Sequence, residues 1–269
     1  ALGTLRLLEI IRHYKKKKIK FYQASSSEMF GKSKPPQNEK TLFQPRSVYA
    51  ISKVFAYHSV IHYRDAYGLY ACNGILFNHE SPRRGVNFVT KKIVQGLVRI
   101  KQGKQKVLTL GNLYSRRDWG HANDYVESMW KILQQKKAND FVVATKTSNS
   151  VKDFINICAK KLNIKLIWKN KGLKEIAINK LTNKIIIKVD QKYFRETEVD
   201  NLIGDFSKAK KMLKWKPKYS FDKLIDDMIY DELNFNRQAN FFSNKSRYFH
   251  KNSVISGLNY SVYEETKRR

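Results

Sequence analysis

Four tyrosines in the chain are each followed by a lysine four positions later, and such a pair can do acid–base chemistry on an alcohol. The pairs are Tyr14/Lys18, Tyr49/Lys53, Tyr219/Lys223 and Tyr263/Lys267. Residues four apart on a helix share one face, so the ammonium can stabilise the phenolate and make the phenol a usable proton acceptor. Because the chain contains 15 tyrosines and 53 lysines and arginines, the spacing alone does not select one pair.

The surroundings of Tyr49 and Lys53 separate this pair from the other three. The pair lies near the start of a predicted helix at 47–67, whose first residue is a serine, a good N-cap. One predicted strand precedes this helix at 19–24 and another follows it at 69–77. Alternating helices and strands predict a parallel sheet with helices on both faces, where ligands bind at the carboxyl ends of the strands. Tyr49 and Lys53 are therefore expected to face that crevice.

Polar side chains follow both strands. They are Ser26 and Glu28 after the first strand, and Asn78, His79 and Arg84 after the second. Glu28 could act as a second base, because a keto group at one carbon acidifies the neighbouring C–H and allows a hydroxyl beyond it to leave. Arg84 and Arg117 could pair with phosphates. Each residue alone is more often a turn residue, a solvated charge or a structural histidine, and the coincidence at two successive strand ends favours a site.

The same alternation continues along the chain. Further helices are predicted at 3–13, 88–101, 122–135, 150–162, 207–214 and 220–234, and further strands at 107–110, 141–144, 166–168 and 185–187. The last two strands are expected to lie around a polar turn, and the residues after Leu233 have no clear period. This order predicts an α/β fold with a doubly wound parallel sheet.

Composition narrows the class of protein. The net charge of +30 could indicate a nucleic-acid or membrane binder, but the lysines are scattered through every segment and no zinc-finger or RNA-recognition signature accompanies them. We expect no nucleic-acid and no membrane partner, and a non-enzymatic basic binding protein remains an alternative that only the charge supports. Cys72 and Cys158 lie in apolar stretches, which predicts buried thiols in a reducing compartment, the cytoplasm, and no metal-binding spacing occurs.

Five segments together resemble the GDP-mannose 4,6-dehydratase family of extended short-chain dehydrogenase/reductase enzymes. They are Phe-Tyr-Gln-Ala-Ser-Ser-Ser-Glu at 21–28, the Tyr49/Lys53 pair, Asn-Gly-Ile-Leu-Phe-Asn-His-Glu-Ser-Pro-Arg-Arg-Gly at 73–85, Arg-Asp-Trp-Gly-His-Ala at 117–122 and Tyr-Phe-Arg-Glu-Thr-Glu-Val-Asp at 193–200. The segments follow the family order over residues 3–233. The run at 78–85 is far more specific than Tyr-x-x-x-Lys.

The resemblance implies a lyase reaction in nucleotide-sugar metabolism. The implied cofactor is NADP, the substrate is GDP-mannose, and the product is GDP-4-keto-6-deoxy-mannose, a precursor of GDP-fucose and related deoxysugars. Tyr49 would assist oxidation at C4, with Lys53 tuning it and binding the nicotinamide ribose. Glu28 would take the C5 proton and help water leave C6, and Ser26 stands where the family commonly has threonine.

The resemblance also implies binding residues, an assembly and domains. His79 and Arg84 match cofactor-contacting positions, together with Tyr49 and Lys53. Asn78, Lys92, Gly111, Arg117, Arg195 and Glu198 match substrate-side positions. Family analogy implies a homodimer or homotetramer. The expected division is 1–149 for the Rossmann-like domain, with some of its segments in the substrate domain, 150–233 mainly for the smaller C-terminal α/β substrate domain, and 234–269 for a poorly specified tail.

Departures from the family pattern qualify these expectations. The family's Arg-Pro-x-Glu-Val reads Arg-Glu-Thr-Glu-Val at 195–199, and no Gly-x-Gly-x-x-Gly or Gly-x-x-Gly-x-x-Gly occurs. We therefore expect an N-terminally truncated chain with a partial sheet that lacks its first strands, and a chain that does not hold NADP alone because the diphosphate turn is missing. The runner-up is a related sugar-nucleotide epimerase or reductase, and Glu28, the carboxylate needed for elimination, separates the two.

Overall fold

The computed structural model describes residues 1–14, 19–194, 197, 199 and 201–234. Residues Ala1–Glu232 form one unit of the chain. The predicted site residues Arg195 and Glu198, and all but the first residue of the predicted tail, lie outside the described residues.

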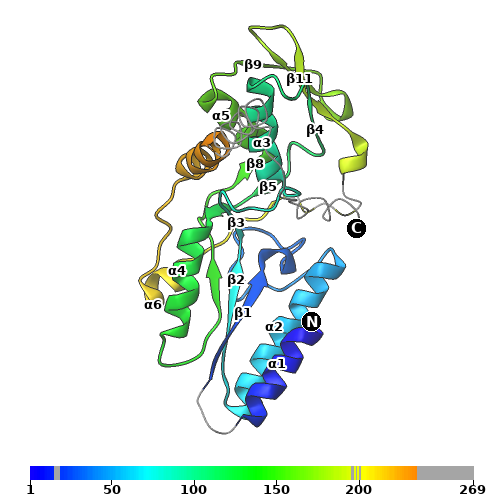
Figure 1. Cartoon of the computed structure of the whole chain (residues 1–269). Helices are drawn as coiled ribbons and strands as arrows, with labels where there is room; N and C mark the ends of the chain where they lie inside the picture. Colours follow the sequence, from blue (N-terminus) through cyan, green and yellow to red (C-terminus); the bar gives the residue numbers. More distant parts are fainter. Residues whose placement is uncertain (15–18, 195–196, 198, 200, 235–269) are drawn as a thin grey trace, which may run out of the picture. The chain divides into compact units, whose positions relative to one another are not determined.

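The first sheet consists of parallel strands covered by helices on both faces. In spatial order its three strands are β1 (Lys20–Ser26), β2 (Tyr70–Leu76) and β7 (Phe141–Val143). One face carries α1 (Leu2–His13) and α2 (Val48–Tyr67), and the other carries α4 (Ala122–Leu133) and α6 (Ser207–Leu213) (Figure 1). The central strand β2 is buried at all positions after the first, as expected for a strand covered on both sides. The predicted α/β class and parallel sheet are confirmed.

Successive residues of β2 supply two separate cores. Ala71 packs with Leu8 of α1 and Val60 of α2. On the opposite face, Cys72 packs in a cluster with Tyr125 of α4 and Trp215. Full burial of one aliphatic or aromatic side chain stabilises a fold by about 1.5–3 kcal/mol, so these two cores hold the helices on the sheet.

The second sheet is mixed. Its four strands, in spatial order, are β4 (Leu108–Leu110), β11 (Ile185–Val189), β10 (Ile176–Asn179) and β9 (Leu166–Lys169). Strand β4 pairs with β11 in parallel, and the other pairs are antiparallel. The expectation of two strands around a polar turn at 163–190 was wrong, because β10 lies between them. Its apolar run of only three residues, between segments rich in lysine, made it look like a turn.

Helices α3 (Val89–Lys101) and α5 (Val151–Lys161) pack against each other beside the second sheet. Gly96 of α3 lies directly against Leu108 of β4, where a Cβ atom would come within 2.8 Å of the leucine side chain. A last helix covers 221–234, close to the predicted range. No helix in the described part of the chain is long and apolar enough to cross a bilayer.

Buried polar contacts join loops that are far apart in sequence. The Gln37 carbonyl accepts a hydrogen bond from the Asp205 backbone N–H at 2.8 Å, and its side-chain oxygen accepts one from the Ile203 N–H at 3.0 Å. The Glu39 carboxylate accepts a hydrogen bond from the Val142 N–H at 2.7 Å, on strand β7. These bonds satisfy backbone groups that would otherwise be buried without partners.

Candidate active site

Ser26 and Glu28 lie where β1 ends. Ser26 is the last residue of the strand and caps the short 3-10 helix η1 (Ser27–Met29), since its Oγ accepts a hydrogen bond from the Glu28 N–H at 3.2 Å. This turn carries the Glu28 carboxylate past the strand end. The carboxylate is about a quarter exposed, and its Oε1 lies 3.9 Å from Nε of Arg117.

Tyr49 and Lys53 lie in the first turns of α2, at the same end of the sheet. Ser47 caps the helix as predicted, with its Oγ accepting a hydrogen bond from the Ala50 N–H. The Lys53 ammonium donates to the carbonyl oxygen of Ala24 on β1 at 2.7 Å and lies 5.7 Å from the Tyr49 ring centroid. The Tyr49 side chain is largely open to solvent, with 54% of the residue exposed.

The contact between Lys53 and β1 joins the two halves of the predicted site. Ala24 is two residues before Ser26, so the Lys53 ammonium contacts β1 close to the strand end that carries Ser26 and Glu28. Desolvation by partial burial lowers the pKa of Lys53. This ammonium lies close to the Tyr49 ring in the first turns of α2.

Arg117 lies beside Glu28, a neighbour that the sequence did not predict for it. It lies on β5 (Arg116–Arg117), is nearly buried, and donates from Nη1 to the carbonyl oxygens of Arg116 and Val199 at 2.9 and 2.6 Å. The Arg117 guanidinium thus contacts two backbone carbonyl oxygens and lies close to the Glu28 carboxylate at the end of β1. The sequence contained no signal for this pairing, because Glu28 and Arg117 are far apart in the chain.

His79 lies on β3 (Asn78–Glu80), which pairs in parallel with β6 (Trp119–His121). The segments at 78–85 and 117–122, which carry part of the family resemblance, are therefore adjacent. The His79 Nδ1 lies 2.9 Å from the carbonyl oxygen of Phe77, and the ring stacks on Tyr125 at 4.9 Å. Burial lowers the pKa of His79, which favours a neutral ring with the proton on Nδ1.

Gly120 makes room for the aromatic ring under His79. A Cβ atom at this position would lie 2.4 Å from the Tyr125 ring, so any side chain would displace it. The stacked pair of His79 and Tyr125 thus depends on a glycine in the facing strand.

Arg84 is held by a buried acid that the sequence did not single out. Its Nε lies 3.0 Å from Oε2 of Glu80, and its guanidinium lies over the Phe88 ring at 3.5 Å. The same Glu80 oxygen accepts a hydrogen bond from Thr90 at 2.6 Å, and burial raises the pKa of this carboxyl. Glu80 ends a strand and Arg84 lies in the loop after it, where a spacing of four does not predict contact, so no local signal marked this pair.

The predicted substrate-side residues Lys92 and Gly111 meet at Tyr193. The Lys92 ammonium lies 3.8 Å from the Tyr193 ring centroid. A Cβ atom at Gly111 would lie 2.3 Å from the Tyr193 carbonyl oxygen, so only glycine allows this close approach. Asn78 lies beside Trp119 in the pairing of β3 with β6.

Asp118 is a buried carboxylate next to Arg117 in the chain. It was not predicted from the sequence as a site residue. Its oxygens accept hydrogen bonds from the Thr145 backbone and hydroxyl, at 2.8 and 2.6 Å, and from the backbone N–H groups of Lys146 and Gly204, at 2.9 and 3.2 Å. Burial nevertheless raises its pKa to about 6. Asp118 directly follows Arg117, so these four bonds hold the arginine's strand in place.

Comparison with known proteins identifies similar sequences over most of the chain. The matching protein family is described as GDP-mannose 4,6 dehydratase, and the match covers residues 1–228. GDP-mannose 4,6 dehydratase 1 of Arabidopsis thaliana is 52% identical over 236 residues, which are 87% of this chain and 61% of that protein. The enzyme of Dictyostelium discoideum is 49% identical over 237 residues (87% and 67%), and that of Homo sapiens 47% over 239 (88% and 64%). The chain thus spans 61–67% of the length of these relatives.

Solved structures share the fold. RMD from Pseudomonas aeruginosa, complexed with NADPH, superposes with a TM-score of 0.72 at 21% identity and covers 86% of this chain and 72% of its own. The dTDP-glucose 4,6-dehydratase from Bacillus anthracis, complexed with NAD, gives 0.70 at 20% identity, with 87% and 67% covered. At these identities the likeness concerns the α/β architecture alone.

Proposed function

Because this chain belongs to the GDP-mannose 4,6 dehydratase family, we propose that it carries the catalytic groups of a lyase that converts GDP-mannose to GDP-4-keto-6-deoxy-mannose. One observation supports this most directly. The Lys53 ammonium bonds to Ala24 on β1, and this contact brings Tyr49 and Lys53 to the strand end that bears Ser26 and Glu28.

Tyr49 is proposed to remove the proton of the C4 hydroxyl. The phenol is exposed, and the Lys53 ammonium lies 5.7 Å from the centre of its ring. General-base help of this kind contributes about 10²–10⁴-fold to a rate. The Ser26 Oγ uses a lone pair for the Glu28 N–H, so its own proton can be donated to an oxygen of the sugar.

Glu28 is proposed to move the second proton. Once C4 is a keto group, the carboxylate takes the proton from C5, and the resulting acid delivers a proton to the departing C6 hydroxyl. Arg117, 3.9 Å away, places a positive charge beside this carboxylate. In this proposal Tyr49 of α2 acts at C4, and Glu28, which follows β1, acts at the neighbouring C5.

NADP is the proposed cofactor, and its nicotinamide ring when bound supplies hydride acceptance from C4 and hydride return to C6. The described residues fit its nicotinamide side, since the Lys53 ammonium and the exposed Tyr49 ring lie 5.7 Å apart in the first turns of α2. His79 and the Arg84 guanidinium are proposed as further contacts.

The remaining predicted contacts are proposals as well. Asn78, Lys92, Gly111 and Arg117, with Arg195 and Glu198 outside the described residues, are proposed for the substrate side. The proposed domains are residues 1–149, mainly the cofactor-binding domain, residues 150–233, mainly the substrate domain, and residues 234–269, a tail. Strand β4 belongs to the first range but lies in the second sheet. A cytoplasmic location is proposed from the two buried free thiols.

A homo-oligomer is proposed through the outer face of α1 and α2. Leu7 and Ile10 of α1, and Ile51 and Phe55 of α2, are large apolar side chains exposed on these neighbouring helices. Such a face is typical of a protein–protein contact. Ile10→Glu should lower the mass of the particle in sedimentation, and an unchanged mass distribution would contradict this interface.

The proposed reaction is tested by Glu28→Gln in the purified enzyme, with Glu127→Gln as the matched control on the surface of α4. Glu28→Gln should lower dehydration by about 10²–10⁴-fold while C4 oxidation persists, seen as cofactor reduction without deuterium uptake at C5. The control should behave as the unsubstituted enzyme. Full dehydration by the Glu28 variant would defeat the assignment and favour the epimerase or reductase alternative.

A further inference from the structure

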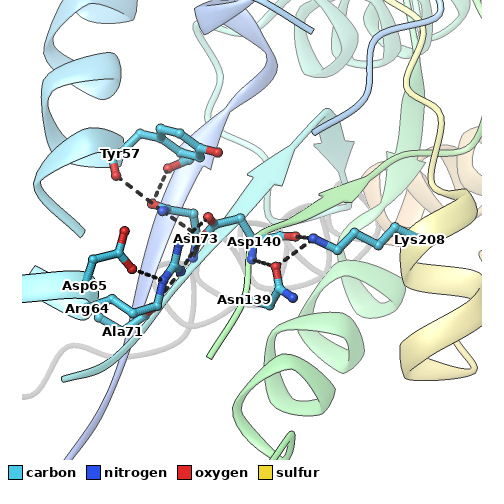
Figure 2. A network of polar contacts seen from close by, with 9 residues as sticks. Tyr57, Arg64, Asp65, Ala71, Asn73, Asn139, Asp140 and Lys208 are labelled. Carbon is cyan, nitrogen blue, oxygen red and sulfur yellow. Dashed lines mark hydrogen bonds and ion pairs between the residues drawn. The ribbon is translucent and has the colours of Figure 1, made fainter. Parts of the chain in front are cut away.

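A buried ion pair lies between α2 and the first sheet. Asp140 precedes β7 and is almost fully buried. Its Oδ1 accepts hydrogen bonds from Arg64 Nη1, from the Asn73 backbone N–H and from Asn73 Nδ2, all at 2.9 Å, and its Oδ2 accepts one from Arg64 Nη2 at 2.8 Å (Figure 2). The carboxylate is therefore fully engaged by one helix and one strand.

Asn73 connects this ion pair to the strand of the proposed active site. Its Oδ1 accepts a hydrogen bond from the Ser25 hydroxyl of β1 at 3.1 Å. Its Nδ2 also lies 3.3 Å from the carbonyl oxygen of Tyr57, in the middle of α2. One fully buried amide thus touches β1, α2 and the residue that leads into β7. Figure 2 shows its contacts with Tyr57 and Asp140.

The residues tied by Asn73 adjoin both halves of the proposed site. Ser25 directly precedes Ser26, and Tyr57 lies two helical turns, about 12 Å, after Tyr49. We propose that Asn73 is a positioning residue that fixes the Tyr49/Lys53 end of α2 relative to the strand end that carries Ser26 and Glu28. This inference rests on the function proposed above.

Other contacts between α2 and β1 are less suited to this task. The Lys53 bond to the Ala24 carbonyl involves an ammonium that the reaction itself needs. The apolar contacts beneath α2 are non-directional, whereas a satisfied buried polar network specifies one arrangement. Since misplacement by about 1 Å can cost about 10²-fold in rate, a directional contact at this point has a catalytic consequence.

Two variants remove the connection, and two others serve as comparisons. Asn73→Ala removes the amide, and Ser25→Ala removes only the bond to β1 and keeps the ion pair. Ser25→Thr restores the hydroxyl. Ser128→Ala is the matched control, because Ser128 is also a buried hydroxyl with one bond, to the Tyr125 carbonyl in α4 at 2.6 Å.

Turnover and hydrogen exchange are measured on the whole protein. Both alanine variants of the network should lower kcat by about 10–100-fold with KM for GDP-mannose within about threefold. Ser25→Thr should recover most of the loss, and Ser128→Ala should show none. The Glu28 amide, bonded to Ser26 Oγ, and the amides in the first turn of α2 should exchange at least about tenfold faster, while the β10 amides remain protected.

The outcomes separate this inference from the proposed function. Unchanged kcat and exchange, or exchange accelerated equally in the second sheet, would overturn the positioning role. If the unsubstituted protein shows no turnover, the proposed function fails, and the exchange pattern alone decides the inference. If Asn73→Ala does not fold, Ser25→Ala and its threonine rescue decide it.

Discussion

Asp118→Asn should change how the stability of the protein depends on pH. The Asp118 carboxyl is fully buried and accepts four hydrogen bonds, yet its pKa lies at about 6 against an ordinary value of 3.8, with burial as the main cause. The four donors stabilise the charged form, and desolvation outweighs them.

The direction in which stability changes with pH follows from the number of protons that the folded and unfolded states bind. Between pH 4 and 6 the folded Asp118 binds more protons than the unfolded chain does, so its contribution to stability is present below the ordinary pKa and is lost as pH rises through the folded pKa. A rise of about two units at 1.36 kcal/mol per unit amounts to about 3 kcal/mol. Asparagine does not titrate, so it makes no pH-dependent contribution to the free energy of unfolding. Its amide NH₂ group faces two backbone N–H donors, which lowers the stability by an amount that does not depend on pH.

Urea unfolding of both proteins at pH 4 and pH 7 measures the effect. The free energy of unfolding of the unsubstituted protein, relative to Asp118→Asn, should fall by about 3 kcal/mol between the two pH values. Asp205→Asn serves as a control of opposite sign, because a hydrogen bond from Ser207 lowers the pKa of Asp205. A difference that stays constant for Asp118→Asn would refute the desolvation argument.

Further substitutions test the packing around the site. Gly120→Ala should displace the ring of Tyr125, 2.4 Å from the new Cβ, and cost about 1–3 kcal/mol in thermal unfolding, and an unchanged Tm would contradict the close contact. Arg64→Met should leave the Asp140 carboxylate buried without its cation and cost about 3–5 kcal/mol by urea unfolding, whereas a loss below about 1 kcal/mol would show that the ion pair is dispensable. Ser150→Ala removes the capping box of α5 and should cost about 1 kcal/mol, with no loss expected for Ser150→Thr.

Local signals predicted the elements that carry the site. The helix expected at 47–67 begins at Val48 and ends at Tyr67, because a serine caps its start and Gly68 at φ 64° ends it. The strand before it extends to Ser26, two residues beyond the predicted end, so Ser26 belongs to the strand and not to the following turn. Cap and turn chemistry act over a few residues and are therefore readable in the sequence.

Long-range pairings were not readable. Arg117 reaches Glu28, and Asn73 reaches Asp140, across tens of residues, and a single asparagine in an apolar strand carries no periodic signal. Strand β4 pairs with β11 because of the tertiary fold, which no local pattern encodes. The sequence thus suggests a set of candidate site residues, and it does not predict which of them contact one another.

The distribution of acids explains how the site is organised. The chain contains 53 basic and 23 acidic residues, so each carboxylate has many possible cationic partners. Three of the buried carboxylates are held by hydrogen bonds or ion pairs within the protein. Asp118 and Asp140 are surrounded by donors and Glu80 is held by Arg84 and Thr90, so these three shape the strands around the crevice. Glu28 differs, because its carboxylate is a quarter exposed and faces its arginine from 3.9 Å. A carboxylate that is oriented and still open to a ligand suits the proposed removal of the C5 proton, and this difference in burial supports the proposal that Glu28 carries out the elimination step.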